Sequence, residues 1–157
     1  MNDKVTQAGG ATAINRRSFL KASLSSMAIV ALSGCNAKQP NADAIVLAPI
    51  AALPKQMQDA PNVVRTAYRF AAAKPDALRN VPCYCGCGSI GHTSNLACYI
   101  SEYGSDGEPV FADHALGCSL CVDIATDVMK MTGEGMSPAD IRQQIVGTYS
   151  KFGPANQ

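Results

Sequence analysis

The chain has 157 residues, of which 47% are hydrophobic and 16% are charged, and its formal net charge at pH 7 is +1. This length fits one domain, and the mixed hydropathy excludes both a disordered chain and a polytopic membrane protein. The small net charge excludes a strongly basic nucleic-acid-binding protein. The cysteine content is unusual, because seven cysteines accompany only two histidines.

The first 35 residues have the features of an export and lipidation signal. Arg16 and Arg17, followed by Phe-Leu-Lys, match a twin-arginine signal, and the apolar stretch 22–32 is too short to span a bilayer. The sequence Leu-Ser-Gly-Cys then ends at Cys35, which we expect to be lipidated and to become the mature N-terminus. We therefore interpret 1–34 as a twin-arginine lipoprotein signal peptide. A short membrane anchor that is never cleaved is the alternative.

Segment 35–53 is rich in Ala, Pro, Asn and Gln and has no hydrophobic period. We expect it to be a flexible, disordered tether that joins membrane lipid, bound through Cys35, to the folded domain. The expected location is the extracytoplasmic side of a membrane, either periplasmic or at the cell surface. Without 1–34 the net charge becomes slightly negative, which argues further against nucleic acid as a partner. Twin-arginine export also implies folding in the cytosol, where reduced thiols are available to a metal.

The domain predicted for 54–157 is mainly α-helical. Apolar residues at helical spacing predict a helix over 62–73, and Pro75 ends it and opens a short helical turn. A second long helix is expected from about 117 to 132, with an apolar inner stripe that begins at the cysteines. These helices predict a small helical bundle around a cysteine-rich loop.

A last helix is expected to begin at Ser137, which caps it and is followed by Pro and an acid. Its predicted buried stripe is Ile141, Ile145, Tyr149 and Phe152.

The segments between the helices contain many Gly and Pro residues. We expect a loop over 81–91, a short helix over 95–100 and a polar surface loop over 101–109. A brief extended stretch is expected at 110–111.

Cysteines and histidines concentrate in two parts of this domain. The run Pro-Cys-Tyr-Cys-Gly-Cys-Gly at 82–88 places three thiols at every second residue. Cys118 and Cys121 are three residues apart at an expected helix start, so both sulfurs point to one face. The candidate metal ligands are Cys83, Cys85, Cys87, His92, Cys98, His114, Cys118 and Cys121.

Thiolate and imidazole donors favour Cu(I) or Zn²⁺, and less strongly an iron–sulfur centre. Six thiols and two imidazoles exceed the needs of one four-coordinate ion. Either two ions share bridging thiolates, or some cysteines form a disulfide beside a single site. We predict a membrane-anchored, exported metal-binding protein that binds or delivers copper or zinc, with a membrane metalloenzyme or a metal exporter as candidate partner.

Two other interpretations stay open. Six cysteines in a small exported domain are typical of a disulfide framework, which would give an interaction module without metal. A thiol–disulfide oxidoreductase could use Cys118 and Cys121, because a helix N-terminus stabilises a thiolate. No βαβ pattern surrounds this pair, and no catalytic triad, P-loop or dinucleotide fingerprint is present. The sequence therefore favours a role without catalysis and names no catalytic residue.

The run Pro-Cys-Tyr-Cys-Gly-Cys at 82–87, followed by His92 and Cys98, resembles the bacterial lipoprotein family named after its PCYCGC motif. The similarity covers roughly 67–149 and includes His114 and the later pair of cysteines. This resemblance implies a membrane-anchored, cysteine-rich protein, and it implies no particular activity.

Overall fold

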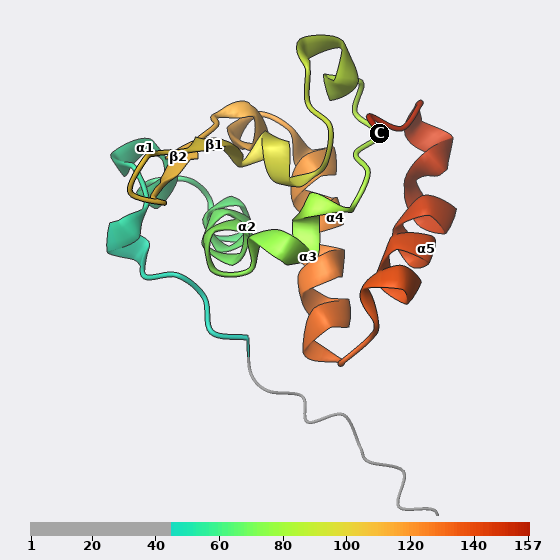
Figure 1. Cartoon of the computed structure of the whole chain (residues 1–157), viewed down its shortest axis with the longest axis horizontal. Helices are drawn as coiled ribbons and strands as arrows, with labels where there is room; N and C mark the ends of the chain where they lie inside the picture. The colour runs from blue at the N-terminus through green and yellow to red at the C-terminus, as the bar shows by residue number, and fades with distance from the viewer. Residues whose placement is uncertain (1–44) are drawn as a thin grey trace, which may run out of the picture. The chain divides into compact units, whose positions relative to one another are not determined.

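A computed structural model describes residues 45–157, in which five α-helices and one two-stranded hairpin are joined by loops and short 3-10 turns (Figure 1). The helices are α1 (Lys55–Gln58), α2 (Asn62–Ala73), α3 (Pro75–Arg79), α4 (Ser119–Gly133) and α5 (Pro138–Tyr149). The antiparallel strands are β1 (Ile100–Tyr103) and β2 (Pro109–Phe111). The predicted mainly helical class is confirmed. The predicted signal peptide, the lipidation residue Cys35 and the tether up to residue 44 lie outside the described residues.

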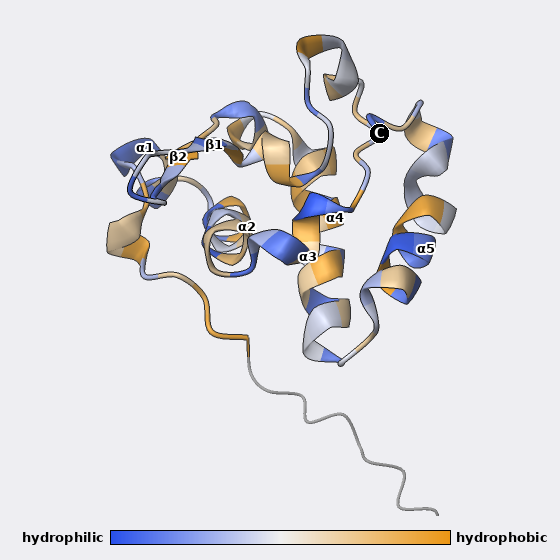
Figure 2. Cartoon of the chain, viewed as in Figure 1, coloured by the Kyte–Doolittle hydropathy of each residue, from blue (hydrophilic) through white to orange (hydrophobic). Residues whose placement is uncertain are grey.

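Helix α4 is the central element of the domain, with α2 and α3 on one side and α5 on the other (Figure 1). Its residues Cys121, Ile124, Ala125 and Val128 are fully buried, and their spacing of three or four residues places them on one stripe. Figure 2 shows this hydrophobic character along α4, beside the more hydrophilic α3. The predicted inner stripe therefore forms the middle of the core and carries one of the candidate ligands into it.

Helix α2 begins and ends where the sequence predicted. Pro61 precedes it and Pro75 follows it, which limits the helix at both ends. Tyr68 is fully buried on α2, and its hydroxyl donates a hydrogen bond of 2.8 Å to the carbonyl of Ala112 beyond the hairpin. The same ring packs edge-on against Tyr99, with ring centroids 5.0 Å apart. Helix α2 thus fixes the hairpin segment against the core.

Helix α5 has the predicted cap. The side-chain oxygen of Ser137 accepts a hydrogen bond from the backbone N–H of Asp140, which satisfies one of the free donors of the first turn. Ile141, Ile145 and Tyr149 are buried as predicted. The prediction for Phe152 was wrong, because the helix changes into a 3-10 turn after Tyr149 and leaves that ring 57% exposed.

The segment between the two long helices differs from the prediction in two places. The expected surface loop over 101–109 is instead most of a β-hairpin, and the expected helix over 95–100 is reduced to the 3-10 turn Leu96–Cys98. Strand β1 buries only its first residue, Ile100, so the alternation that normally indicates a strand is missing from the sequence. The predicted extended stretch at 110–111 is confirmed within β2.

The packed part of the chain begins before residue 54. Ile45 and Leu47 lie against the core, and Leu53 is only 3% exposed. The backbone of Ala48 is tied to Arg69 of α2 by two hydrogen bonds. The last residues of the segment that we expected to be a tether therefore contribute to the folded domain.

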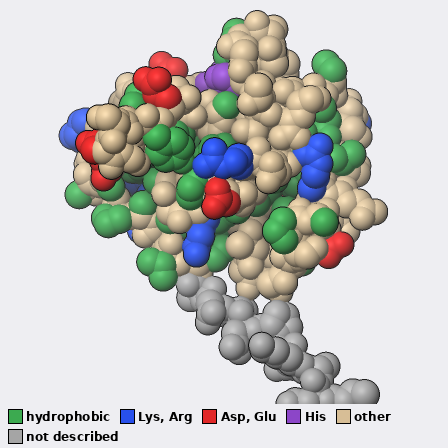
Figure 3. Space-filling view, viewed as in Figure 1, with side chains coloured by type: hydrophobic (Ala, Val, Ile, Leu, Met, Phe, Trp, Pro, Cys, Tyr) green, Lys and Arg blue, Asp and Glu red, His purple; other side chains and the backbone are tan. Residues whose placement is uncertain are grey.

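The surface of the described residues carries both signs of charge. Figure 3 shows basic and acidic side chains scattered over one face among hydrophobic ones. Two ion pairs occur among residues 45–157, Lys55–Asp59 and Arg79–Asp76, and both are exposed, so they add little to stability. Within the same range, no helix has the length and apolar character needed to cross a membrane.

Candidate metal centre

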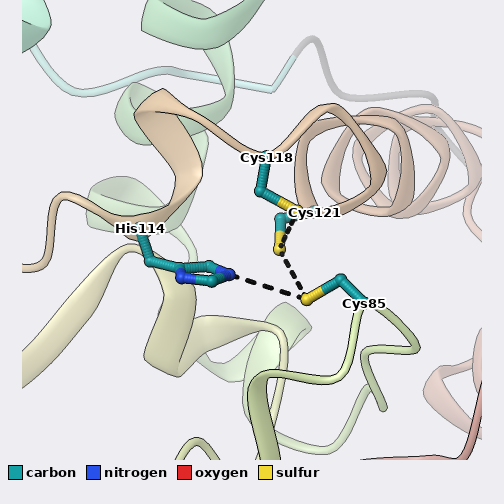
Figure 4. A group of neighbouring side chains, drawn as sticks. All are labelled: Cys85, His114, Cys118 and Cys121. Carbon is teal, nitrogen blue, oxygen red and sulfur yellow. Dashed lines mark hydrogen bonds between the residues drawn. The ribbon is translucent and has the colours of Figure 1, made fainter. Parts of the chain in front are cut away.

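Four separate parts of the described chain bring their cysteines and histidines to one place. The loop before the turn Cys87–Ile90 supplies Cys83 and Cys85, the first residue of that turn supplies Cys87, and the following segment supplies His92 and Cys98. His114 comes from a 3-10 turn, and Cys118 and Cys121 come from the start of α4. Figure 4 shows the side chains of Cys85, His114, Cys118 and Cys121 directed toward one another. All eight predicted ligand candidates therefore lie in one cluster.

Cys121 is at the centre of this cluster. Its Sγ atom lies 3.2 Å from Sγ of Cys118, 3.3 Å from Cys98, 3.5 Å from Cys83 and 3.6 Å from Cys85. Cys121 is fully buried, as are two of these four neighbours. Thiols that are far apart in the sequence are therefore in van der Waals contact around one sulfur atom.

The remaining donors surround this centre. Sγ of Cys98 lies 3.8 Å from Sγ of Cys87 and 3.5 Å from Nδ1 of His92. Nε2 of His114 lies 3.6 Å from Sγ of Cys85. The two imidazole rings meet edge to face, with centroids 4.9 Å apart. Each histidine therefore contacts a different part of the sulfur cluster.

These separations suit ligands of a metal ion. In a tetrahedral thiolate site with metal–sulfur distances of about 2.3 Å, neighbouring sulfurs are about 3.7 Å apart. The sulfur contacts in the cluster range from 3.2 to 3.8 Å. Two sets of four donors have all their ligand atoms within 4.8 Å of one another: Cys85, His114, Cys118, Cys121; and Cys87, His92, Cys98, His114. The cluster can therefore hold a soft metal ion.

All six cysteines within residues 45–157 are free thiols. The disulfide framework that the sequence left open is therefore not formed in this structure.

Proton sharing within the cluster follows from the crowding of its thiols. Hydrogen bonds from the thiols of Cys121 and then Cys98 lower the pKa of Cys83, and donation to Cys83 raises the pKa of Cys121. Burial raises the pKa of Cys85 to about 12. Burial also lowers the pKa of His92, and electrostatic interaction with His114 lowers it further. Without a cation the cluster thus keeps most of its thiols protonated, and a metal ion would displace those protons.

The C-terminal tail holds the cysteine loop from outside. The backbone N–H of Cys83 donates a hydrogen bond of 2.7 Å to Oδ1 of Asn156, whose own N–H donates to the carbonyl of Cys83 at 3.1 Å. Nδ2 of Asn156 also contacts Sγ of Cys87 at 3.4 Å. Gly153 lies so close to the loop that a Cβ there would be 2.9 Å from the carbonyl oxygen of Tyr84. Figure 1 shows this end of the chain beside the loop.

Two further residues support the cluster from the core. The carbonyl oxygen of Cys121 accepts hydrogen bonds from the Tyr99 hydroxyl at 2.8 Å and from Nδ2 of Asn95 at 3.3 Å. Both side chains are fully buried. Sequence reasoning missed these two residues and Asn156. Asn95 and Tyr99 flank Cys98 closely enough to have been considered, whereas nothing in the sequence connects Asn156 with a loop 73 residues away.

A family model based on many sequences matches residues 28–156, which is most of the chain. The chain belongs to the PCYCGC-motif family. That family is described as "protein of unknown function with PCYCGC motif", and its match confirms the resemblance carried by the run 82–87. No curated protein and no solved structure matches the chain. The family description assigns no activity, so the function of this PCYCGC protein has to be argued from its site.

Proposed function

We propose that this PCYCGC protein is an exported, membrane-anchored metal-binding protein that holds copper or zinc in its Cys/His cluster. The observation that carries the proposal is the contact of six free thiols with two imidazoles, contributed by separate parts of the chain. Buried polar groups normally find a partner, and six thiols gathered in one cluster find one best in a shared cation. Anchoring through Cys35 is the part of the proposal that rests on the sequence alone.

The donor set selects soft metal ions. Thiolate and imidazole ligands favour Cu(I) and Zn²⁺, whereas Ca²⁺ and Mg²⁺ need oxygen ligands. Among the hydrogen bonds within residues 45–157, none joins a Lys or Arg side chain to a cluster sulfur. Thiolates there would be uncompensated charges in a buried site, which costs several kcal/mol per ion. A bound metal ion supplies the missing positive charge.

The surroundings of Cys118 support metal exchange with a partner. Cys118 is only partly buried, and it lines a hollow of about 290 Å³ whose other walls include Val63, Leu116 and Val122. A ligand residue of another protein could reach this sulfur, whereas the sulfur of Cys121 is fully enclosed. We therefore propose delivery to, or receipt from, a membrane metalloenzyme or a metal exporter.

A second candidate function is thiol–disulfide exchange. Cys118 occupies the N-cap position directly before α4, and its sulfur lies 3.2 Å from that of Cys121. A helix N-terminus stabilises a thiolate, which is the reactive form of cysteine. The contacts of Cys121 with three further sulfurs favour the metal site, because an exchange-active pair needs no additional thiols.

Elemental analysis combined with thiol titration tests the proposal. The full chain is produced in a host with twin-arginine export, purified without added metal, and compared with the double variant Cys85→Ser/Cys121→Ser and the control Ser119→Ala. We expect stoichiometric copper or zinc with thiols unoxidised in the wild type and in the control, and less bound metal in the double variant, which disrupts the set Cys85, His114, Cys118 and Cys121. Absence of metal together with oxidised cysteines would contradict the proposal. A pair that cycles with mild reductant would favour the second function.

Membrane anchoring has its own test. Cys35→Ser should move the exported protein from the membrane fraction to the soluble fraction, because the lipid attachment point is removed. Cys118→Ser serves as the control that keeps Cys35. If Cys35→Ser stays in the membrane fraction, a lipid at this residue is not the anchor.

A further inference from the structure

The position of Cys121 limits how the cluster can be shared among metal ions. A ligand of one tetrahedral ion has three fellow ligands at about 3.7 Å. Sγ of Cys121 has four sulfur neighbours between 3.2 and 3.6 Å. All five sulfurs cannot be ligands of a single four-coordinate ion. Cys121 is therefore placed to serve more than one ion.

The neighbours of Cys121 divide into two groups that share it. The first group is Cys85, His114, Cys118 and Cys121. The second group is Cys83, Cys98 and Cys121. In each group the ligand atoms lie within 4.8 Å of one another. Cys121 is the only residue that belongs to both.

We infer that the cluster binds two Cu(I) ions, one in each group, with the thiolate of Cys121 as the bridge between them. This inference rests on the proposed function and specifies its metal and its stoichiometry. Each thiol that binds exchanges its S–H bond for a sulfur–copper bond and releases its proton to solvent. Copper stays in the Cu(I) state throughout, so no oxidant or reductant is needed.

The second group explains the choice of metal. Its three thiols are all fully buried, and the group includes no imidazole and no carboxylate. Zn²⁺ in protein sites is almost always four-coordinate, whereas Cu(I) is a soft ion that is satisfied by three sulfur ligands. Within these three residues alone, a Zn²⁺ ion would lack the fourth ligand of a tetrahedral site.

Anaerobic titration of the full chain with Cu(I), against a chromophoric chelator that competes for it, gives the stoichiometry. Native mass spectrometry counts the ions in each species, and X-ray absorption reports a short copper–copper path. We expect two ions and that path in the wild type. Cys118→Ser alters only the first group, which keeps Cys85, His114 and Cys121, and it should weaken the binding of one of the two ions. Ser119→Ala changes no donor of the cluster and should keep both.

The outcomes separate this inference from the proposed function. A single ion in the wild type would overturn the bridged pair and leave the metal-binding function in place. Two ions without a copper–copper path, or two ions retained with that path in Cys121→Ser, would overturn the role of Cys121 as bridge. No bound copper or zinc would overturn both. Cys121→Ser should lose the path and at least one ion, and Cys118→Ser carries the test if the buried Cys121 variant does not fold.

Discussion

The two sides of the metal cluster are held in different ways. On the helix side, Cys121 is part of α4, whose buried stripe continues through Ile124 and Val128. On the loop side, Cys83 and Cys85 lie in the loop between α3 and the turn Cys87–Ile90, and Asn156 of the tail provides hydrogen bonds to the backbone of Cys83. The helix side is therefore fixed by a regular buried stripe. The loop side also buries Cys83 and Tyr84 but belongs to no helix or strand, and its backbone depends on a few hydrogen bonds.

This difference has an energetic meaning. Full burial of a side chain such as Ile124 or Val128 contributes about 1.5–3 kcal/mol, so the helix side is stable without help from the cluster. A typical hydrogen bond contributes only about 0.5–1.5 kcal/mol net, and the tail makes few of them to the loop. Metal bound between the two sides should therefore order the loop far more than the helix.

Removal of the metal is the strongest test of this comparison. Extraction with a Cu(I) or Zn²⁺ chelator should lower the melting temperature by more than about 10 °C. A ligand present at about a thousand times its Kd stabilises the folded state by roughly 4 kcal/mol, and this contribution is lost with the metal. Hydrogen exchange should accelerate over 83–98, while the amides of Ala125 and Val128 stay protected. Equal loss of protection on both sides would show that α4 also depends on the metal.

Asn156→Ala should have the next largest effect. The variant removes the acceptor for the N–H of Cys83 and the contact to Cys87, and a lost partner for buried groups costs about 1–3 kcal/mol. Metal affinity should also fall roughly 10–100-fold, the range for loss of a residue that orients ligands, and we expect this loss to appear as faster metal release. Stopped-flow transfer to a chelator measures the rate. Gln157→Ala is the matched control, because Gln157 contacts Arg142 and no cluster residue. Equal rates in the two variants would contradict a holding role for Asn156.

Gly86→Ala should have a smaller effect that is confined to the loop side. Gly86 has φ +85°, a conformation that costs a residue with a side chain about 1–2 kcal/mol. Gly117→Ala, near the helix side, should be neutral or slightly stabilising, because Gly117 has φ −108° and no atom within 4 Å of an added Cβ. Chemical denaturation of the metal-free forms compares the two. If both variants lost a similar free energy of unfolding, the loop at Gly86 would have adjusted its backbone to accept the side chain.

The same contrast explains what the sequence could and could not predict. Helix α2 and the cap at Ser137 depend on local signals, namely apolar spacing and turn residues, and both were predicted correctly. The convergence of the cysteines could be expected from their residue type. The role of Asn156 could not, because it depends on the tail returning to the loop, and a tertiary contact of this kind leaves no periodic pattern. The hairpin was missed for a related reason, since β1 buries only Ile100 and its pairing with β2 replaces the alternation of a buried strand.

Ser137→Ala should have the smallest effect and should leave the cluster unchanged. Loss of an N-cap costs about 1 kcal/mol, which lowers the melting temperature by a few degrees in a domain of this size. Ser137 begins α5, whereas the tail that reaches the loop follows the other end of that helix, after Tyr149. Fraying at the first turn therefore does not move Asn156, and copper stoichiometry and release rate should equal those of the wild type. Pro138→Ala is a suitable control, because it keeps the cap at the same helix end. Faster metal release in Ser137→Ala would show that α5 transmits disorder along its whole length, and that the loop side is coupled to the core more tightly than its few hydrogen bonds indicate.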